Sequence, residues 1–190
     1  MSFDKPVKVS LKGQLLLADP SLQEPTFFQS VLLLTDHSED DGAHGYILNR
    51  PLSQTVSELL TNEQFQGGHF DKLSNVPVHM GGPVSTEHLT FAAFAWSEMD
   101  KELQFSTHLS ASEAVMYQME GYHIRAFVGY SGWSGGQIEG ELKQNAWIVR
   151  KPGADMIRSS WEFELWKEYL REVSPWHKLV ADEPENPEWN

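Results

Sequence analysis

The segment of the chain best suited to chemistry is rich in glycine and serine and surrounds one tryptophan, Gly129–Gln137. Within it, Gly132–Gly136 matches G-x-S-x-G, a pattern that places a reactive serine hydroxyl on a sharp strand-to-helix turn. Ser134 is therefore a candidate nucleophile for a hydrolase. An acid and then a histidine should follow such a serine, and His177, near the chain end, is the only histidine that does. Ser134 can instead cap the helix that follows the turn.

The same turn could also bind an anion. The N–H groups at a helix start attract negative charge, and glycines such as Gly135 and Gly136 let a ligand approach the backbone closely. The alternative is a tight turn that needs glycine for its own geometry. A second glycine turn, Gly81–Gly82, ends a predicted strand but matches neither the P-loop nor the dinucleotide-binding pattern. Arg50 is a cation at another strand end, where it could anchor an anion or pair with the acidic surface.

The residue types give little support to metal or cofactor chemistry. The chain has no cysteine, which excludes thiolate nucleophiles and Cys-ligated metals. Histidine and acidic side chains crowd one predicted hairpin loop, but they lack calcium-loop spacing, and H-E-x-x-H does not occur. These residues, which we interpret as a solvated hairpin tip, are Asp36, His37, Glu39, Asp40, Asp41 and His44. The sequence predicts no metal and no cofactor.

Short apolar runs broken by turn residues predict the strands that must position these groups. The predicted strands are Val7–Ala18, Val31–Leu34, His44–Asn49, Val76–Met80, Leu89–Ala95, Leu103–Thr107, Tyr122–Tyr130 and Ala146–Val149. The predicted helices are Ser53–Leu60, Ser110–Glu120, Ser134–Leu142 and Ser159–Val173, whereas Thr61–Asn75 looks irregular.

Strands in hairpin-like groups, interrupted by helices, indicate an α+β fold. We expect a mixed, largely antiparallel sheet with helices packed on it and with Tyr122–Tyr130 near its centre. One domain should span residues 1–175, and a loose acidic tail containing proline and tryptophan should follow over residues 176–190.

The charge of the chain restricts its partners. The formal net charge is −13, and lysine and arginine are not clustered, so the protein should repel phosphate backbones. We therefore expect no direct binding to nucleic acid. The apolar runs are too short to cross a membrane, and the first residues lack the apolar core of a signal peptide. These features predict a cytoplasmic protein that does not enter membranes.

Several segments form a specific combination: Gly13–Pro20 followed by Phe27–Val31, then His37–Pro51, Met80–Val84, and Gly129–Leu142 with Ala146–Trp147. In this order and spacing they resemble the YqgE/AlgH family of uncharacterised bacterial proteins. The resemblance implies a compact fold with a branched, partly barrel-like sheet surrounded by helices. It implies no established enzyme activity and no established cofactor. The AlgH name reflects a proposed regulatory role in gene expression.

The family pattern Trp-x-x-Gly-Gln falls on Trp133, Gly136 and Gln137, and Ser134 falls on a variable place within it. Two departures from the family are visible. Asp19 stands where the family often has methionine, and the tryptophan-containing end from Trp176 has no family counterpart.

Three functions follow from these observations. We expect first a non-catalytic protein that binds a small anion or a protein partner and acts as a regulator. The residues predicted to bind the ligand are Asn49, Arg50, Gly81, Gly82, Trp133 and Gln137. The alternatives are a serine hydrolase that uses Ser134 and a transcriptional regulator of the AlgH type that acts on DNA.

Overall fold

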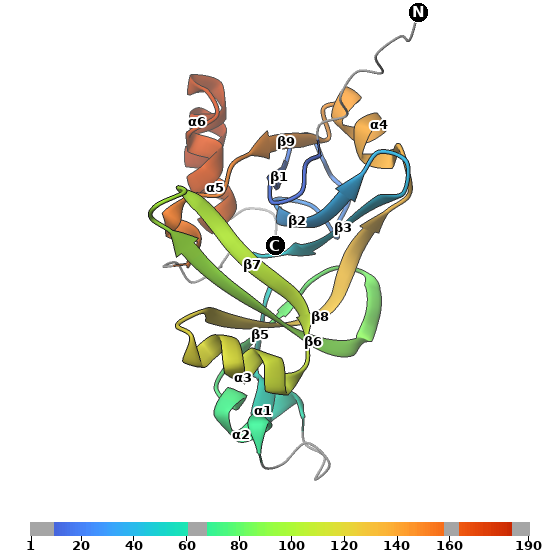
Figure 1. Ribbon diagram of the computed structural model, residues 1–190. Coiled ribbons are helices and arrows are strands. Elements are labelled where there is room, and N and C mark those ends of the chain that lie inside the picture. The colour runs from blue at the N-terminus through green and yellow to red at the C-terminus, as the bar shows by residue number, and fades with distance from the viewer. Residues whose placement is uncertain (1–9, 61–67, 158–163, 184–190) are drawn as a thin grey trace, which may run out of the picture.

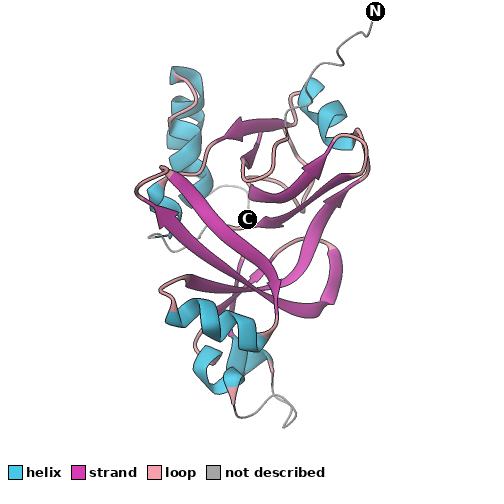
Figure 2. Ribbon diagram, viewed as in Figure 1, coloured by secondary structure: helices cyan, strands magenta, loops and turns pink. Residues whose placement is uncertain are grey.

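Residues 10–60, 68–157 and 164–183 are described by the computed structural model (Figures 1 and 2). Within them, nine strands form one sheet. The strands are β1 (Leu15–Ala18), β2 (Val31–Ser38), β3 (Gly42–Ile47), β4 (Pro51–Thr55), β5 (Pro77–Met80), β6 (Val84–Ser97), β7 (Glu102–Leu109), β8 (His123–Trp133) and β9 (Trp147–Arg150). The helices are α1 (Val56–Leu59), α2 (His69–Leu73), α3 (Ala111–Met119), α4 (Gln137–Lys143), α5 (Glu164–Arg171), α6 (Pro175–Asp182) and the short 3-10 helix η2 (Ala154–Ile157).

Strand β8 is the branch point of the sheet. The main path runs β4-β5-β8-β3-β2-β1-β9, and the β6–β7 hairpin leaves this path through the pairing of β6 with β8. The β5–β8 pair is parallel, and every other pair of described strands is antiparallel. Figure 1 shows the sheet curled into a half-barrel, with the β6–β7 hairpin as a separate arm. The predicted α+β fold, with its branched, largely antiparallel sheet and central strand, is confirmed.

The strands form where apolar residues can be buried on both faces of the sheet. In β1, Leu15 and Leu17 point into the core cluster that includes α5, whereas Leu16 and Ala18 point into the cluster beneath α4. This alternation follows from the two-residue period of a strand. A third cluster, centred on Ala126 of β8, packs against α3 and the short helices α1 and α2.

The segment after β3 differs from the prediction in two ways. Strand β4 forms from Pro51, where no strand is predicted, and the helix that follows begins at Val56 with Thr55 as its cap rather than at Ser53. Strand β4 lies at the end of the sheet path, where the missing N–H of proline is tolerated. Thr55 succeeds as the cap because Glu58, three residues later, accepts the Thr55 N–H in a capping box. Helix α2 also forms in a segment predicted to be irregular.

The C-terminal helices bring one confirmation and one correction. Helix α5 lies within the predicted Ser159–Val173 helix and buries its apolar stripe, although residues 158–163 lie outside the described residues. Helix α6 forms where the sequence predicts a loose tail. Ser174 caps it by accepting the His177 N–H, and Pro175 takes the first helical turn, where no N–H is needed. Among the described helices, none is both long and apolar enough to cross a membrane.

Candidate functional site

Trp133, at the centre of the glycine-rich segment, is a core residue. Its side chain is buried, and its ring lies 6.2 Å from that of Phe27 and 6.4 Å from that of Trp147, centroid to centroid. The indole Nε1 of Trp133 donates to Glu141 at 3.1 Å, and the indole Nε1 of Trp147 donates to the same carboxylate oxygen at 2.6 Å. The ring therefore packs within the core against Phe27 and Trp147, and Glu141 ties the two indoles together.

The interpretation of Ser134 as the cap of the following helix is wrong. Helix α4 begins at Gln137, and the residue before it, Gly136, is the cap, with a left-handed φ of 76° and no side-chain hydrogen bond. A turn closed by the Gln137 N–H and the Ser134 carbonyl separates the serine from the helix. The hydroxyl of Ser134 is therefore not the cap. The Gln137 amide oxygen does reach back to the Ser134 N–H at 3.1 Å, and its nitrogen donates to Glu141 at 2.9 Å.

The chain itself fills the space around Gly135 and around Gly42, the glycine of the β2–β3 hairpin. A Cβ atom on Gly135 would collide with the carbonyl of Asp40, and one on Gly42 would collide with the carbonyl of Trp133. Both contacts come from the tip of the β2–β3 hairpin, which lies against the turn. Glycine is needed here because two backbone segments approach closely. At Gly135 this geometry favours a tight structural turn over an anion cradle. A Cβ atom on Gly136 would meet nothing within 4 Å, and its left-handed φ of 76° is what calls for glycine there.

The histidine that a Ser134 hydrolase would need has another role. His177 lies in the first turn of α6, where its Nδ1 is 2.8 Å from the Ser174 hydroxyl. Figure 1 shows α6 and α4 on different flanks of the molecule. Only the G-x-S-x-G pattern is therefore left in support of Ser134 as a nucleophile.

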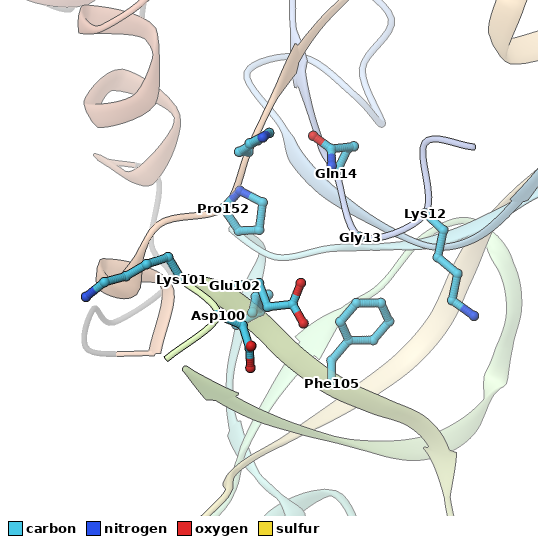
Figure 3. A pocket seen from close by; sticks show the side chains of 10 residues that line it. Lys12, Gly13, Gln14, Asp100, Lys101, Glu102, Phe105 and Pro152 are labelled. Atoms are coloured by element: carbon cyan, nitrogen blue, oxygen red, sulfur yellow. The ribbon is translucent and has the colours of Figure 1, made fainter. Parts of the chain in front are cut away.

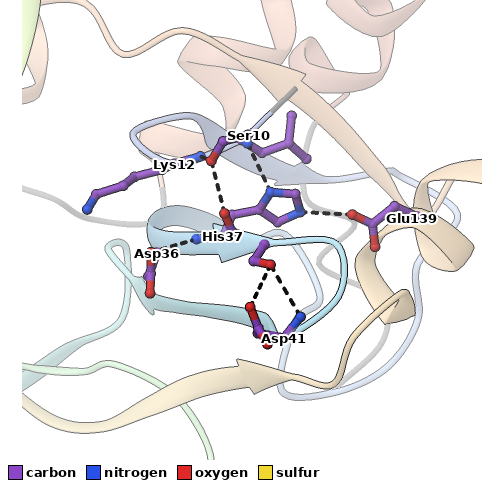
Figure 4. A network of polar contacts seen from close by, with 8 residues as sticks. Ser10, Lys12, Asp36, His37, Asp41 and Glu139 are labelled. Carbon is purple, nitrogen blue, oxygen red and sulfur yellow. Dashed lines mark hydrogen bonds and ion pairs between the residues drawn. The ribbon is translucent and has the colours of Figure 1, made fainter. Parts of the chain in front are cut away.

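His37, in the predicted hairpin tip, is a buried connector (Figure 4). Its Nδ1 accepts the Leu11 N–H at 3.1 Å, so the neutral ring carries its proton on Nε2. That nitrogen lies 2.9 Å from a carboxylate oxygen of Glu139 on α4. Because both ring nitrogens are engaged, the His37–Glu139 pair holds residues before β1 and α4 together rather than offering a free base. Across the described residues, no three histidine or acidic side chains form a group that could hold a metal.

Asn49 and Arg50 hold the turn that precedes β2. The fully buried Asn49 accepts the Val31 N–H at 2.8 Å and donates to the Gln29 carbonyl at 2.9 Å. The guanidinium of Arg50 donates to the carbonyls of Asn49 and Phe28. Burial lowers the pKa of Arg50. Both side chains thus have structural partners.

The Gly81–Gly82 turn packs against β8. The Gly81 carbonyl accepts the Ile47 N–H at 2.8 Å and the Ser131 hydroxyl at 3.2 Å. A Cβ atom on Gly82 would collide with the backbone of Tyr130. The glycines thus permit close packing of backbone on backbone.

The six predicted ligand-binding residues are spread along β3. Trp133 pairs with Ala43 at the start of that strand, Gly81 bonds to its last residue, and Asn49 and Arg50 follow its end. They therefore do not converge on one cavity, and their ligand-binding role stays a prediction.

A cavity of about 370 Å³ lies elsewhere, between the β6–β7 arm and the residues that flank β1 and β9 (Figure 3). We call it the seam cavity. Its lining residues are Lys12, Gly13, Gln14, Asp100, Lys101, Glu102, Leu103, Phe105, Lys151 and Pro152. The Phe105 ring reaches across to Gly13, where a Cβ atom would lie 3.6 Å from the ring edge. Gly13 is in turn fixed to β2 by its N–H bond to Leu34.

The charged side chains around the seam cavity fall into two groups. Asp100 accepts the Ser97 hydroxyl at 2.7 Å, and Lys101 pairs with Glu98 at 2.7 Å, so both serve the β6–β7 turn. The side chains of the other three have no hydrogen-bond or ion-pair partner in the described part of the chain; they are Lys12, Glu102 and Lys151. Sequence reasoning missed this cavity because its residues come from three distant segments and share no motif.

Comparisons with known proteins agree with this fold. Residues 15–177 match the family described as AlgH-like. A UPF0301 protein of Streptomyces coelicolor is 34% identical over 192 residues, covering 95% of this chain and 96% of that protein. One from Bacteroides thetaiotaomicron is 29% identical over 187 residues, covering 94% and 91%.

Two solved structures extend the likeness to three dimensions. The solution structure of the AlgH protein from Pseudomonas aeruginosa gives a TM-score of 0.63 at 25% identity, covering 98% of this chain and all of that one. The crystal structure of protein DIP2367 from Corynebacterium diphtheriae gives a TM-score of 0.65 at 18% identity, covering 96% and 95%, and supports the fold. The chain therefore belongs to the AlgH-like family of UPF0301 proteins.

Proposed function

We propose that this protein is a non-catalytic regulatory protein of the cytoplasm that binds a small molecule in the seam cavity. One observation carries the proposal: three charged side chains that have no hydrogen-bond or ion-pair partner among the described residues line one cavity together with the Phe105 ring, between two arms of a branched sheet. Six of the ten lining residues are charged or polar, and Leu103, Phe105 and Pro152 supply apolar surface, so the cavity offers a ligand both kinds of contact.

A second cavity provides a useful contrast. It measures about 430 Å³ and is lined by His37 and Glu139, among others. Its polar groups are already bonded within the chain, because His37 is engaged at both ring nitrogens and the Ser10 hydroxyl donates to the His37 carbonyl. A ligand there would have to break these bonds, whereas a ligand in the seam cavity would break none at Lys12, Glu102 or Lys151.

The position of the cavity suggests how a bound ligand could control the binding of a protein partner. Among the described strands, β7 pairs only with β6, so the far side of the β6–β7 arm has no strand beside it. A ligand that contacts Phe105 on this arm and Gln14 at β1 would hold the arm against the main sheet. A protein partner that recognises the arm would then respond to the ligand.

Thermal unfolding with a panel of charged metabolites tests the proposal. A true ligand should raise the melting temperature of the wild-type protein, because it binds the folded state alone. Lys12→Gln and Lys151→Gln should weaken that effect, whereas Lys143→Gln, on the exposed end of α4, should leave it unchanged. The proposal is wrong if no compound stabilises the protein, or if the stabilisation is insensitive to both cavity lysines.

A further inference from the structure

The unpaired charges of the seam cavity are of both signs. Lys12 and Lys151 are cationic, and Glu102 is anionic. In Figure 3, Glu102 lies beside Phe105, while Lys12 and Pro152, the neighbour of Lys151, lie on opposite sides of the ring. The lining therefore contains one carboxylate, that of Glu102, beside the Phe105 ring, and two lysines that come from different segments of the chain.

We infer that the ligand of the seam cavity is an acidic amino acid or a close relative, with one ammonium and two carboxylate groups. This inference rests on the proposed function and adds the chemical class of the ligand. The ligand ammonium lies between the Glu102 carboxylate and the face of Phe105, where charge pairing and cation–π attraction act together. The two carboxylates face Lys12 and Lys151.

Simpler ligands fit these charges less well. An inorganic anion would meet two lysines but also the Glu102 carboxylate, which repels it. A simple amine would meet Glu102 but also two ammonium groups. A ligand with both kinds of group satisfies all three side chains, and the Gln14 amide offers one further donor and acceptor.

The size of the cavity supports the same class. Ligand pockets usually measure roughly 300–1,000 Å³, and the seam cavity, at about 370 Å³, lies at the small end of this range. A single amino acid or a short peptide fits such a volume.

Glutamate and glutarate provide a matched pair of probes, because they differ only in the α-ammonium group. We expect L-glutamate to bind wild-type protein about fivefold more tightly than glutarate, the contribution of one exposed charge pair. The measurement is a titration followed by NMR, with the amide signals of Gly13 and Gln14 reporting on the cavity. Cadaverine, an amine without carboxylates, should leave these signals in place.

Substitutions then separate the roles of the charges. Glu102→Gln should remove the preference for glutamate over glutarate. Lys12→Gln and Lys151→Gln should each weaken both ligands by a similar factor, and Lys143→Gln should change neither. All four side chains are exposed, so these variants keep the fold, which circular dichroism verifies.

The outcomes distinguish this inference from the proposed function. Equal binding of glutarate and glutamate, or a preference that survives Glu102→Gln, would refute the amino-acid inference. So would the absence of glutamate binding; in that case the proposed function would still stand if another compound stabilised the protein in a way that depends on Lys12 and Lys151.

Discussion

The carboxylate of Glu141 should be one of the most important polar groups for the stability of this protein. It accepts the indole N–H groups of Trp133 and Trp147 and the side-chain amide of Gln137. Glu141→Leu removes this acceptor and leaves two indole donors in the core without a partner. A buried donor that loses its partner costs about 1–3 kcal/mol. Since leucine recovers some apolar burial, we expect a net loss of about 3 kcal/mol.

This loss is large enough to measure in several ways. For a chain of this size, each kcal/mol lowers the melting temperature by about 2–4 °C, so Glu141→Leu should melt about 6–12 °C below wild type. Urea unfolding followed by tryptophan fluorescence gives the free energy directly, and the indole contacts make the same signal sensitive to the site. Glu141→Gln keeps one acceptor oxygen and should lose about half as much.

Glu168→Leu is the matched control, because Glu168 lies on the exposed face of α5. Surface changes of this kind are usually within about 0.5 kcal/mol of neutral. If Glu141→Leu were as stable as Glu168→Leu, the three hydrogen bonds would contribute nothing net. The account of the glycine-rich segment as a corner held by Glu141 would then be wrong.

Three further predictions concern the alternatives and the buried groups. Ser134→Ala should change the free energy of unfolding by less than about 0.5 kcal/mol, because its hydroxyl caps no helix, whereas Gln137→Ala should cost about 1 kcal/mol in urea unfolding. A stoichiometric fluorophosphonate label on the wild-type protein that is lost in Ser134→Ala would instead reveal a nucleophile. Purified protein should show no duplex-DNA affinity near 10⁻⁸ M at about 0.15 M salt in a binding titration, because its net charge is −13; such an affinity would contradict the charge argument. Burial raises the pKa of Tyr46 to about 12, so the folded state keeps a proton that the unfolded state loses near pH 10, and stability should fall as pH rises from about 10 to about 12. Tyr46→Phe should make urea midpoints less dependent on pH in that range, and an unchanged slope would contradict this.

Local patterns predicted the parts of the fold that local interactions determine. The capping box of α3 forms as expected, with Ser110 and Glu113 exchanging bonds at 3.3 and 2.8 Å. The apolar runs Leu15–Ala18 and Val31–Leu34 are strands because both faces of the sheet are covered. Strand β4 was not predictable in this way, since it is short, largely exposed and lies at the end of the sheet path.

The prediction of α6 as a loose tail failed for a different reason. Proline and acidic residues near a chain end are typical of loose segments, but Pro175 occupies the one helical turn where proline is favourable. Ala181 is buried in the core cluster of α5, and Arg171 pairs with Asp182 at 2.7 Å. The Ser174 cap and Pro175 are local signals of this helix, whereas the contact with α5 that buries Ala181 is tertiary and is not contained in a single sequence.

The candidate site also depends on tertiary contacts that a single sequence does not contain. Glycine-rich motifs attract attention because glycine permits both ligand approach and close packing, and sequence alone does not distinguish the two. In this fold the carbonyl of Asp40 occupies the space over Gly135, so the motif serves the chain's own packing. Lys12, Glu102 and Lys151 belong to no motif, yet the curl of the sheet brings them to one cavity, where they have no partner among the described residues. No local pattern signals such a meeting of distant residues, so the seam cavity becomes visible only in the folded chain. Its role as a ligand site is the proposal that the Glu102 and lysine variants test.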